Sequence, residues 1–163
     1  MEPAGFCFCG AVNCEITREL RLRELKRVEG VESDMNQDLL DIQDKVIVVT
    51  GASSGLGMYF AQTLASRGAI VVMGARRLEP LEALSASINK EGGQSMAVAL
   101  DVTSRDSVSA AFDLVDATYG GADVVVNNAG VAPNKPFLQQ TEQDWDQALD
   151  TNLKGAFLVS QIF

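Results

Sequence analysis

Histidine is absent from the 163-residue chain, which excludes every catalytic or metal site that needs an imidazole. Positive charge is scarce as well, because 13 Lys and Arg stand against 22 Asp and Glu, for a net charge of −9. Nucleic acids bind to basic surfaces, so this balance argues against a nucleic-acid partner. No apolar run approaches the roughly 20 residues that span a bilayer, and residues 1–4 lack the positive charge and long apolar core of a signal peptide. These absences predict a cytoplasmic protein without a membrane partner.

The composition that remains is that of a globular α/β domain of ordinary size, with 47% hydrophobic and 6% aromatic residues. From residue 45 onward, short apolar runs alternate with amphipathic stretches. We expect strands at residues 46–50, 70–73, 95–100 and 122–126, and helices at 56–67, 80–91, 105–119 and from 142 onward. Strands that alternate with helices of these lengths predict parallel βαβ units in one sheet.

Local signals predict the ends and faces of these helices. Ser104 is a candidate N-cap, Gly120 is a candidate C-terminal stop, and Thr141 with Asp144 is a candidate capping box. The residues expected to share one face in each successive helix are Leu56, Phe60 and Leu64; Leu81, Leu84 and Ile88; Val108, Phe112 and Val115; and Trp145, Leu149, Asn152 and Ala156.

Residues 1–34 differ in character from the rest of the chain. They carry all three cysteines and a charged run at residues 18–32, and they show no apolar face that matches the later pattern. We expect residues 1–34 to be a disordered N-terminal extension and residues 35–163 to form the folded domain.

The cysteines leave more than one interpretation open. Cys7, Cys9 and the Gly-Ala-Val that follows resemble the opening of the glutathione-dependent formaldehyde-activating zinc family. A closed zinc site takes four nitrogen or sulfur ligands, and only Cys14 is left to join the pair. The alternatives are incidental cysteines kept reduced in the cytoplasm, or a fragment of that zinc family joined upstream. We expect no working metal site.

An apolar run followed by a glycine-rich turn carries most of the functional information. Residues 50–57 read Thr-Gly-x-x-x-Gly-x-Gly, directly after the first strand and directly before a helix. This order presents backbone N–H groups and a helix N-terminus to a dinucleotide pyrophosphate. The glycines permit the tight turn, the approach of the pyrophosphate and close packing of helix on sheet, in that order. The cofactor-binding residues predicted in this turn are Gly51, Ser53, Ser54, Gly55, Leu56 and Gly57.

Two arginines follow the second strand, where a dinucleotide-binding fold meets the adenosine ribose. An acidic side chain at this place accepts from the 2′-hydroxyl of NAD, whereas arginine accommodates the 2′-phosphate of NADP. The chain has Arg76 and Arg77 here and no carboxylate before Glu79. The pair therefore favours NADP over NAD as the cofactor. The alternative is a solvated pair at the start of a surface helix.

Together with Asn-Asn-Ala-Gly at residues 127–130, the glycine turn resembles the short-chain dehydrogenase/reductase family. The resemblance runs from about residue 39 to residue 163. It implies a partial Rossmann-type, doubly wound parallel sheet made of the first four strands and their helices. It also implies that Asp101 and Val102 lie at the adenine edge, although Asp101 could instead only open the next turn. The residues implied to line the cofactor at the fourth strand, in a motif that also stabilises the central sheet, are Asn128, Ala129 and Gly130.

The catalytic part of the family pattern is incomplete. Asn152, in Asn-x-x-Gly at residues 152–155, matches the asparagine that holds a water in the family's proton relay, which implies a catalytic role. Neither Tyr59 nor Tyr119 is followed four residues later by lysine, so the family's Tyr-x-x-x-Lys does not occur. We therefore expect a chain truncated at its C-terminus, with the strand at 122–126 as an uncovered edge.

These observations predict the N-terminal part of an NADP-preferring oxidoreductase that transfers hydride between a nicotinamide and a carbonyl or alcohol carbon. The sequence character is similar to that of 3-oxoacyl-carrier-protein reductases. The complete enzyme is expected to act on a small molecule and to form a homo-oligomer. The alternative is a non-catalytic nucleotide-binding or interaction module that lacks the Tyr–Lys pair.

Overall fold

The computed structural model describes residues 41–163. The predictions for residues 1–34, including those for the three cysteines, lie outside the described residues. In the part of the chain that is described, no helix is long and apolar enough to cross a membrane. The same part contains no cluster of acidic or cysteine side chains that could hold a metal ion.

Four parallel strands form one sheet. They are β1 (Val46–Thr50), β2 (Ile70–Ala75), β3 (Gln94–Ala99) and β4 (Val124–Val126), in the spatial order β3-β2-β1-β4. Val48 on β1 lies opposite Val72 on β2 and Val125 on β4. The central strands β1 and β2 are almost wholly buried, which explains their continuous apolar sequence. The predicted parallel sheet is confirmed, and β4 is one of its two edges within the described residues.

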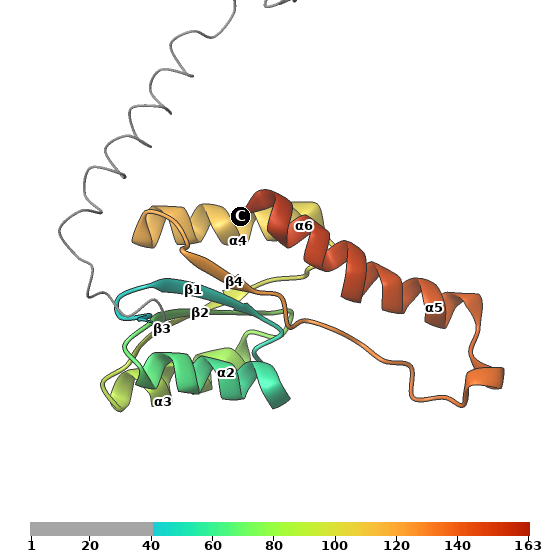
Figure 1. The fold of residues 1–163 in the computed structure, drawn as a ribbon, viewed down its shortest axis with the longest axis horizontal. Coiled ribbons are helices and arrows are strands. Elements are labelled where there is room, and N and C mark those ends of the chain that lie inside the picture. Colours follow the sequence, from blue (N-terminus) through green and yellow to red (C-terminus); the bar gives the residue numbers. More distant parts are fainter. Residues whose placement is uncertain (1–40) are drawn as a thin grey trace, which may run out of the picture. The chain divides into compact units, whose positions relative to one another are not determined.

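Helices cover both faces of this sheet, as Figure 1 shows. On one face lie α2 (Gly55–Ser66) and α3 (Glu79–Lys90); on the other lie α4 (Arg105–Tyr119) and α6 (Gly155–Ile162). This arrangement is the doubly wound α/β fold that the sequence predicts.

Two hydrophobic cores lie on opposite sides of the sheet. Ile47 and Val49 of β1 belong to the core beneath α2 and α3, whereas Val46 and Val48 belong to the core beneath α4 and α6. The predicted apolar faces of α3 and α4 are confirmed as buried: Leu81, Leu84, Ile88, Val108, Phe112 and Val115.

The predicted apolar face of α2 is wrong. Leu56 and Phe60 are 68% and 37% exposed, and Leu64 is only partly buried. The buried residues of α2 are small: Gly57, Ala61 and Ala65. A Cβ on Gly57 would lie 2.4 Å from the carbonyl oxygen of Gly51, so α2 approaches the glycine turn at backbone contact distance. Only small side chains fit at that separation, and the large apolar residues of α2 therefore turn outward.

The last helical segment is not one regular helix. α5 (Glu142–Leu149) continues into a π-helical turn, η3 (Asp150–Lys154), and then into α6. Figure 1 shows α5 extending away from the sheet, and none of its residues is buried. The predicted stripe is therefore wrong: Trp145 and Leu149 are 61% and 40% exposed, because no core formed by residues 41–163 includes them. The wider π-turn also changes the angular phase, and burial begins only in α6.

The predicted helix ends are confirmed. Ser104 caps α4 by accepting a hydrogen bond from the Ser107 N–H, and Gly120 ends α4 in the left-handed conformation, with φ of 81°. At α5, Thr141 Oγ1 accepts from the Asp144 N–H while Asp144 accepts from the Thr141 N–H, which completes the capping box.

Candidate nucleotide-binding site

A cavity of about 560 Å³ lies at the carboxyl ends of the strands, the edge where open α/β sheets bind ligands. Its lining comes from the segments that follow each strand and from η3: Gly51, Ser53, Ser54, Ala75, Arg76, Arg77, Leu100, Asp101, Val102, Thr103, Asn128, Ala129, Gly130, Val131 and Thr151. Most of the predicted site residues therefore meet at one cavity. The predicted residues outside this lining are Gly55, Leu56, Gly57 and Asn152.

The glycine turn combines a left-handed backbone with an open side. Gly51 and Gly55 have φ of 68° and 57°, a region that residues with a Cβ rarely adopt. A Cβ on Gly51 would lie 2.8 Å from the Cα of Ala129, whereas one on Gly55 would meet nothing within 4 Å. Directly before Gly55, the side chain of the N-cap residue Ser54 makes no capping hydrogen bond within residues 41–163. A helix N-terminus that has no side-chain cap and begins with an unobstructed glycine is suited to bind an anion.

Thr50 ends β1 with a buried hydroxyl that joins the glycine turn to the end of β4. Its Oγ1 accepts hydrogen bonds from the N–H groups of Asn128 and Ala129, both at 3.0 Å, and donates to the Val126 carbonyl at 3.3 Å. Asn128 Nδ2 also donates to the carbonyl oxygens of Thr50 and Gly51, at 3.0 and 3.3 Å. The sequence prediction includes Asn128 and omits Thr50, although a polar residue that closes an apolar strand was a usable signal.

The end of β4 is also tied to α6. Asn127 Nδ2 donates to Ser160 Oγ at 3.0 Å. A Cβ on Gly155 would lie 2.7 Å from Val102 Cγ2, so α6 begins in close contact with a cavity residue. The Asn-Asn motif therefore joins β4 both to β1 and to α6, which fits the sheet-stabilising role that the resemblance implies.

Charge enters the cavity from Arg76, Arg77 and Asp101. Both arginines are exposed, and neither forms an ion pair with another residue of the range 41–163. Asp101 Oδ1 accepts from the hydroxyl and the N–H of Thr103, at 2.7 and 3.0 Å. These hydrogen bonds, and less strongly the charge of Arg76, hold the pKa of Asp101 below its ordinary value, against the opposing effect of burial. Asp101 thus forms the turn before α4 and remains ionised in the same cavity as Arg76.

Asn152 lies beside the cavity and holds one of its lining residues. Its Oδ1 accepts from the Val131 N–H at 2.8 Å, and its Nδ2 donates to the Val131 carbonyl at 2.9 Å. The preceding residue, Thr151, lines the cavity. The side chain of Asn152 therefore has a structural partner, and its role in a proton relay stays a prediction. No sequence motif covers Val131 or Thr151, which is why both are absent from the predicted site.

No tyrosine lines the cavity among residues 41–163. Tyr59 lies on α2 and is 63% exposed, and Tyr119 ends α4. Lys154, in η3, pairs with Asp150 at 3.3 Å. The described residues thus build a cavity without a tyrosine–lysine pair.

The sheet order, the helices on both faces and the glycine turn define a Rossmann-type α/β protein of the dinucleotide-binding class. A family model described as short chain dehydrogenase matches residues 45–163, and the chain belongs to this family.

Known relatives agree with this assignment. An uncharacterised oxidoreductase of Listeria monocytogenes is 40% identical over 116 residues, which are 71% of this chain and 47% of the relative. A 3-oxoacyl-[acyl-carrier-protein] reductase of Aquifex aeolicus is 37% identical over 123 residues, 75% of this chain and 50% of the relative. A metagenomic short-chain oxidoreductase crystallised in complex with NADP superposes with a TM-score of 0.69 at 38% identity, over 76% of this chain and 56% of that one. The chain spans about half the length of the curated relatives it matches.

Proposed function

We propose that this chain forms the nucleotide-binding part of an NADP-dependent oxidoreductase that moves a hydride between the nicotinamide and a carbonyl or alcohol carbon. The nicotinamide, when bound, supplies or accepts the hydride, and the protein supplies binding and orientation. The observation that carries the proposal is the open turn at Gly55, which leads to the uncapped N-terminus of α2.

The pyrophosphate would bind to the first turn of α2. The N–H groups of Leu56 and Gly57 belong to the first helical turn and have no carbonyl of their own helix to bind. Gly55 leaves the space before them empty, and the hydroxyls of Ser53 and Ser54 can add hydrogen bonds from the cavity wall. A helix N-terminus also carries a partial positive charge, so each of these features favours the same anionic group.

The preference for NADP rests on Arg76 and Arg77. Guanidinium groups bind phosphate with charge-assisted and often bidentate hydrogen bonds, and neither of these two forms a direct ion pair within residues 41–163. Asp101 and Val102, from the same cavity wall, would hold the adenine edge. The NADP complex of a structural relative supports this choice.

The substrate would be a small carbonyl or alcohol compound. One relative is named as a reductase of a 3-oxoacyl group on acyl-carrier protein, which supports a carbonyl as the reacting group. The complete enzyme would act as a homo-oligomer. In this proposal, the cavity residues would hold the nucleotide rather than the substrate. A second candidate function is a nucleotide-binding module without catalysis. It is favoured by one observation, which is that neither Tyr59 nor Tyr119 lines the cavity.

Calorimetric titration of the full chain with NADP⁺ tests the proposal, with Gly55→Ala and Gly120→Ala as matched variants. Both glycines are left-handed with open space for a Cβ, so both variants should lose a similar stability, about 1–2 kcal/mol. Only Gly55→Ala should weaken NADP⁺ binding, by roughly tenfold or more, because its Cβ enters the pyrophosphate space. Absence of NADP⁺ binding, or equal losses in the two variants, would contradict the proposal.

A further inference from the structure

The chain between β4 and α5 forms an arm, residues 131–141, which extends from the carboxyl edge of the sheet and returns through α5 and η3 (Figure 1). Two side-chain contacts tie the outgoing chain to the returning helices. At the base of the arm, Asn152 of η3 holds the backbone of Val131 on both its N–H and its carbonyl. Further out, Lys135 contacts Asp144 of α5. Two contacts therefore join the two sides of the arm, an inner one at Asn152 and an outer one at Lys135.

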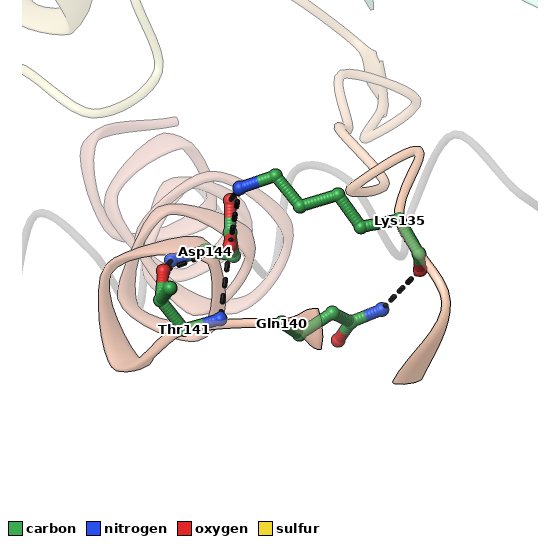
Figure 2. Close-up of polar contacts among 4 residues, drawn as sticks. All are labelled: Lys135, Gln140, Thr141 and Asp144. Atoms are coloured by element: carbon green, nitrogen blue, oxygen red, sulfur yellow. Dashed lines mark hydrogen bonds and ion pairs between the residues drawn. The ribbon is translucent and has the colours of Figure 1, made fainter. Parts of the chain in front are cut away.

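Figure 2 shows the outer contact, between Lys135 and Asp144. Lys135 Nζ lies 2.8 and 2.7 Å from the two carboxylate oxygens of Asp144. Asp144 Oδ2 also accepts from the N–H and the hydroxyl of Thr141, at 2.9 and 2.8 Å. Gln140 Nε2 donates to the carbonyl oxygen of Lys135 at 3.2 Å. One carboxylate therefore binds both ends of the segment 135–141.

This ion pair differs from the other lysine pair near the site. Lys154 and Asp150 lie one turn apart on the same helical segment, at 3.3 Å, and their side chains are 58% and 55% exposed. Asp144 is only 16% exposed and reaches across a loop to Lys135. A less solvated carboxylate with several donors makes stronger hydrogen bonds than a solvated one. The Lys135–Asp144 pair is therefore suited to hold the arm, and the Lys154–Asp150 pair supplies a control.

Within residues 41–163, the tip of the arm otherwise makes local backbone hydrogen bonds, from the Gln139 N–H to the Pro136 carbonyl at 2.8 Å and from the Gln140 N–H to the Phe137 carbonyl at 3.2 Å. It consists of Pro136 and η2 (Phe137–Gln139), and its side chains Phe137 and Leu138 are 82% and 94% exposed. Neither belongs to a hydrophobic core of the described chain. Because no core of the described residues packs against this apolar turn, its position relative to α5 depends on the side-chain contacts at its two ends.

We propose that Lys135 and Asp144 form a latch that keeps the arm in one conformation and couples its apolar tip to the nucleotide cavity at its base. The coupling follows from the inner contact, in which Asn152 binds Val131. Val131 lines the cavity, and so does Thr151, the neighbour of Asn152. The latch itself depends only on the contacts above, whereas the coupling rests on the proposed function. In this proposal, Lys135 and Asp144 position the arm, and neither side chain lines the cavity.

Chymotrypsin cleavage after Phe137, followed by mass spectrometry of the full chain, measures how well the tip is held. Lys135→Met removes the latch and leaves the capping box of α5 intact, so it should speed this cleavage roughly twofold to fivefold. Lys154→Met is the matched control and should leave the cleavage rate unchanged. Lys135→Arg keeps a cation that can bind both carboxylate oxygens and should restore the wild-type rate. Circular dichroism of each variant checks that the sheet and helices remain folded.

Equal cleavage rates in the wild type and folded Lys135→Met overturn the latch. The coupling is tested by repeating the digestion with saturating NADP⁺, which should slow cleavage of the wild type more than that of Lys135→Met. Equal slowing in both proteins overturns the coupling. If calorimetry detects no NADP⁺ binding, the proposed function fails and the coupling with it, while the nucleotide-free digestion still decides the latch.

Discussion

Asn128 donates two hydrogen bonds to Thr50, one from its backbone N–H to the Thr50 hydroxyl and one from its side-chain Nδ2 to the Thr50 carbonyl. The two residues end β1 and follow β4, which lie side by side in the sheet. The two hydrogen bonds hold the start of the glycine turn against the cavity wall, which Asn128 lines. The geometry of the candidate nucleotide site therefore depends on hydrogen bonds between the strand ends.

Thr50→Val should destabilise the protein by about 1–3 kcal/mol, because it keeps the shape of the side chain but leaves the partly buried Ala129 N–H without its acceptor. The Asn128 N–H loses one acceptor and keeps the Val126 carbonyl. Urea denaturation measures the change. Thr118→Val is the control, since the Thr118 hydroxyl is exposed and donates only to the Leu114 carbonyl. It should change stability by less than about 0.5 kcal/mol. Similar losses in the two variants would show that the Thr50 hydroxyl does not hold the strand ends together.

The pH dependence of stability should report the latch carboxylate. The hydrogen bond from Lys135, followed by those from Thr141, lowers the pKa of Asp144 from its ordinary value of 3.8 to about 2. Between these values the unfolded chain binds more protons than the folded one, so stability must fall as the pH falls. The contribution is complete above about pH 4 and is lost toward about pH 2.

Urea denaturation at neutral pH and at about pH 3 measures this effect, with Asp144→Asn as the comparison. The pKa of Asp101 is also lowered and contributes with the same sign, so the wild type alone does not isolate Asp144. The loss of stability on acidification should be smaller in Asp144→Asn than in the wild type. An identical loss in both proteins would exclude Asp144 as a source of the pH dependence.

The 163-residue chain should not oxidise NADPH in the presence of ketones. It lacks Tyr-x-x-x-Lys, and general acid–base help of this kind contributes typically ~10²–10⁴ in rate. Loss of absorbance of NADPH is the assay, with a 3-oxoacyl thioester and simple ketones as substrates. Turnover that copurifies with the chain and disappears in Gly55→Ala would refute this expectation.

The fold could be predicted from the sequence wherever local signals and burial agree. The apolar runs of β1 and β2, the faces of α3 and α4, and the caps at Ser104 and Thr141 are of this kind. The face of α2 could not, because a Cβ on Gly57 would lie 2.5 Å from Asn128 Nδ2, and the sequence does not show that α2 lies this close to the end of β4. The exposed stripe of α5 has the same kind of cause, since its periodicity is helical but no core lies beneath it.

The candidate site was predictable where a motif reports a backbone requirement. Gly51 and Gly55 need a left-handed backbone, and Arg76 follows a strand end, so position and residue type suffice. Val131 and Thr151 reach the cavity only because the chain returns through a π-turn, and no residue type marks such a return. The hydrogen bonds from Asn128 to Thr50 join strand ends that are far apart in sequence, and the sequence alone does not state which strands are neighbours.

The central claim is that Arg76 and Arg77 make this cavity an NADP site. Calorimetry of the full chain should give tighter binding for NADP⁺ than for NAD⁺, and Arg76→Asp should reverse that order. The expected change for NADP⁺ is a loss of about 1.5–3 kcal/mol, the value of a hydrogen bond to a charged group. Arg67→Asp makes the same change of charge at an exposed residue outside the cavity and should keep the order of the wild type. Equal affinity of the wild type for the two nucleotides, or the same response to Arg76→Asp and Arg67→Asp, would contradict the claim.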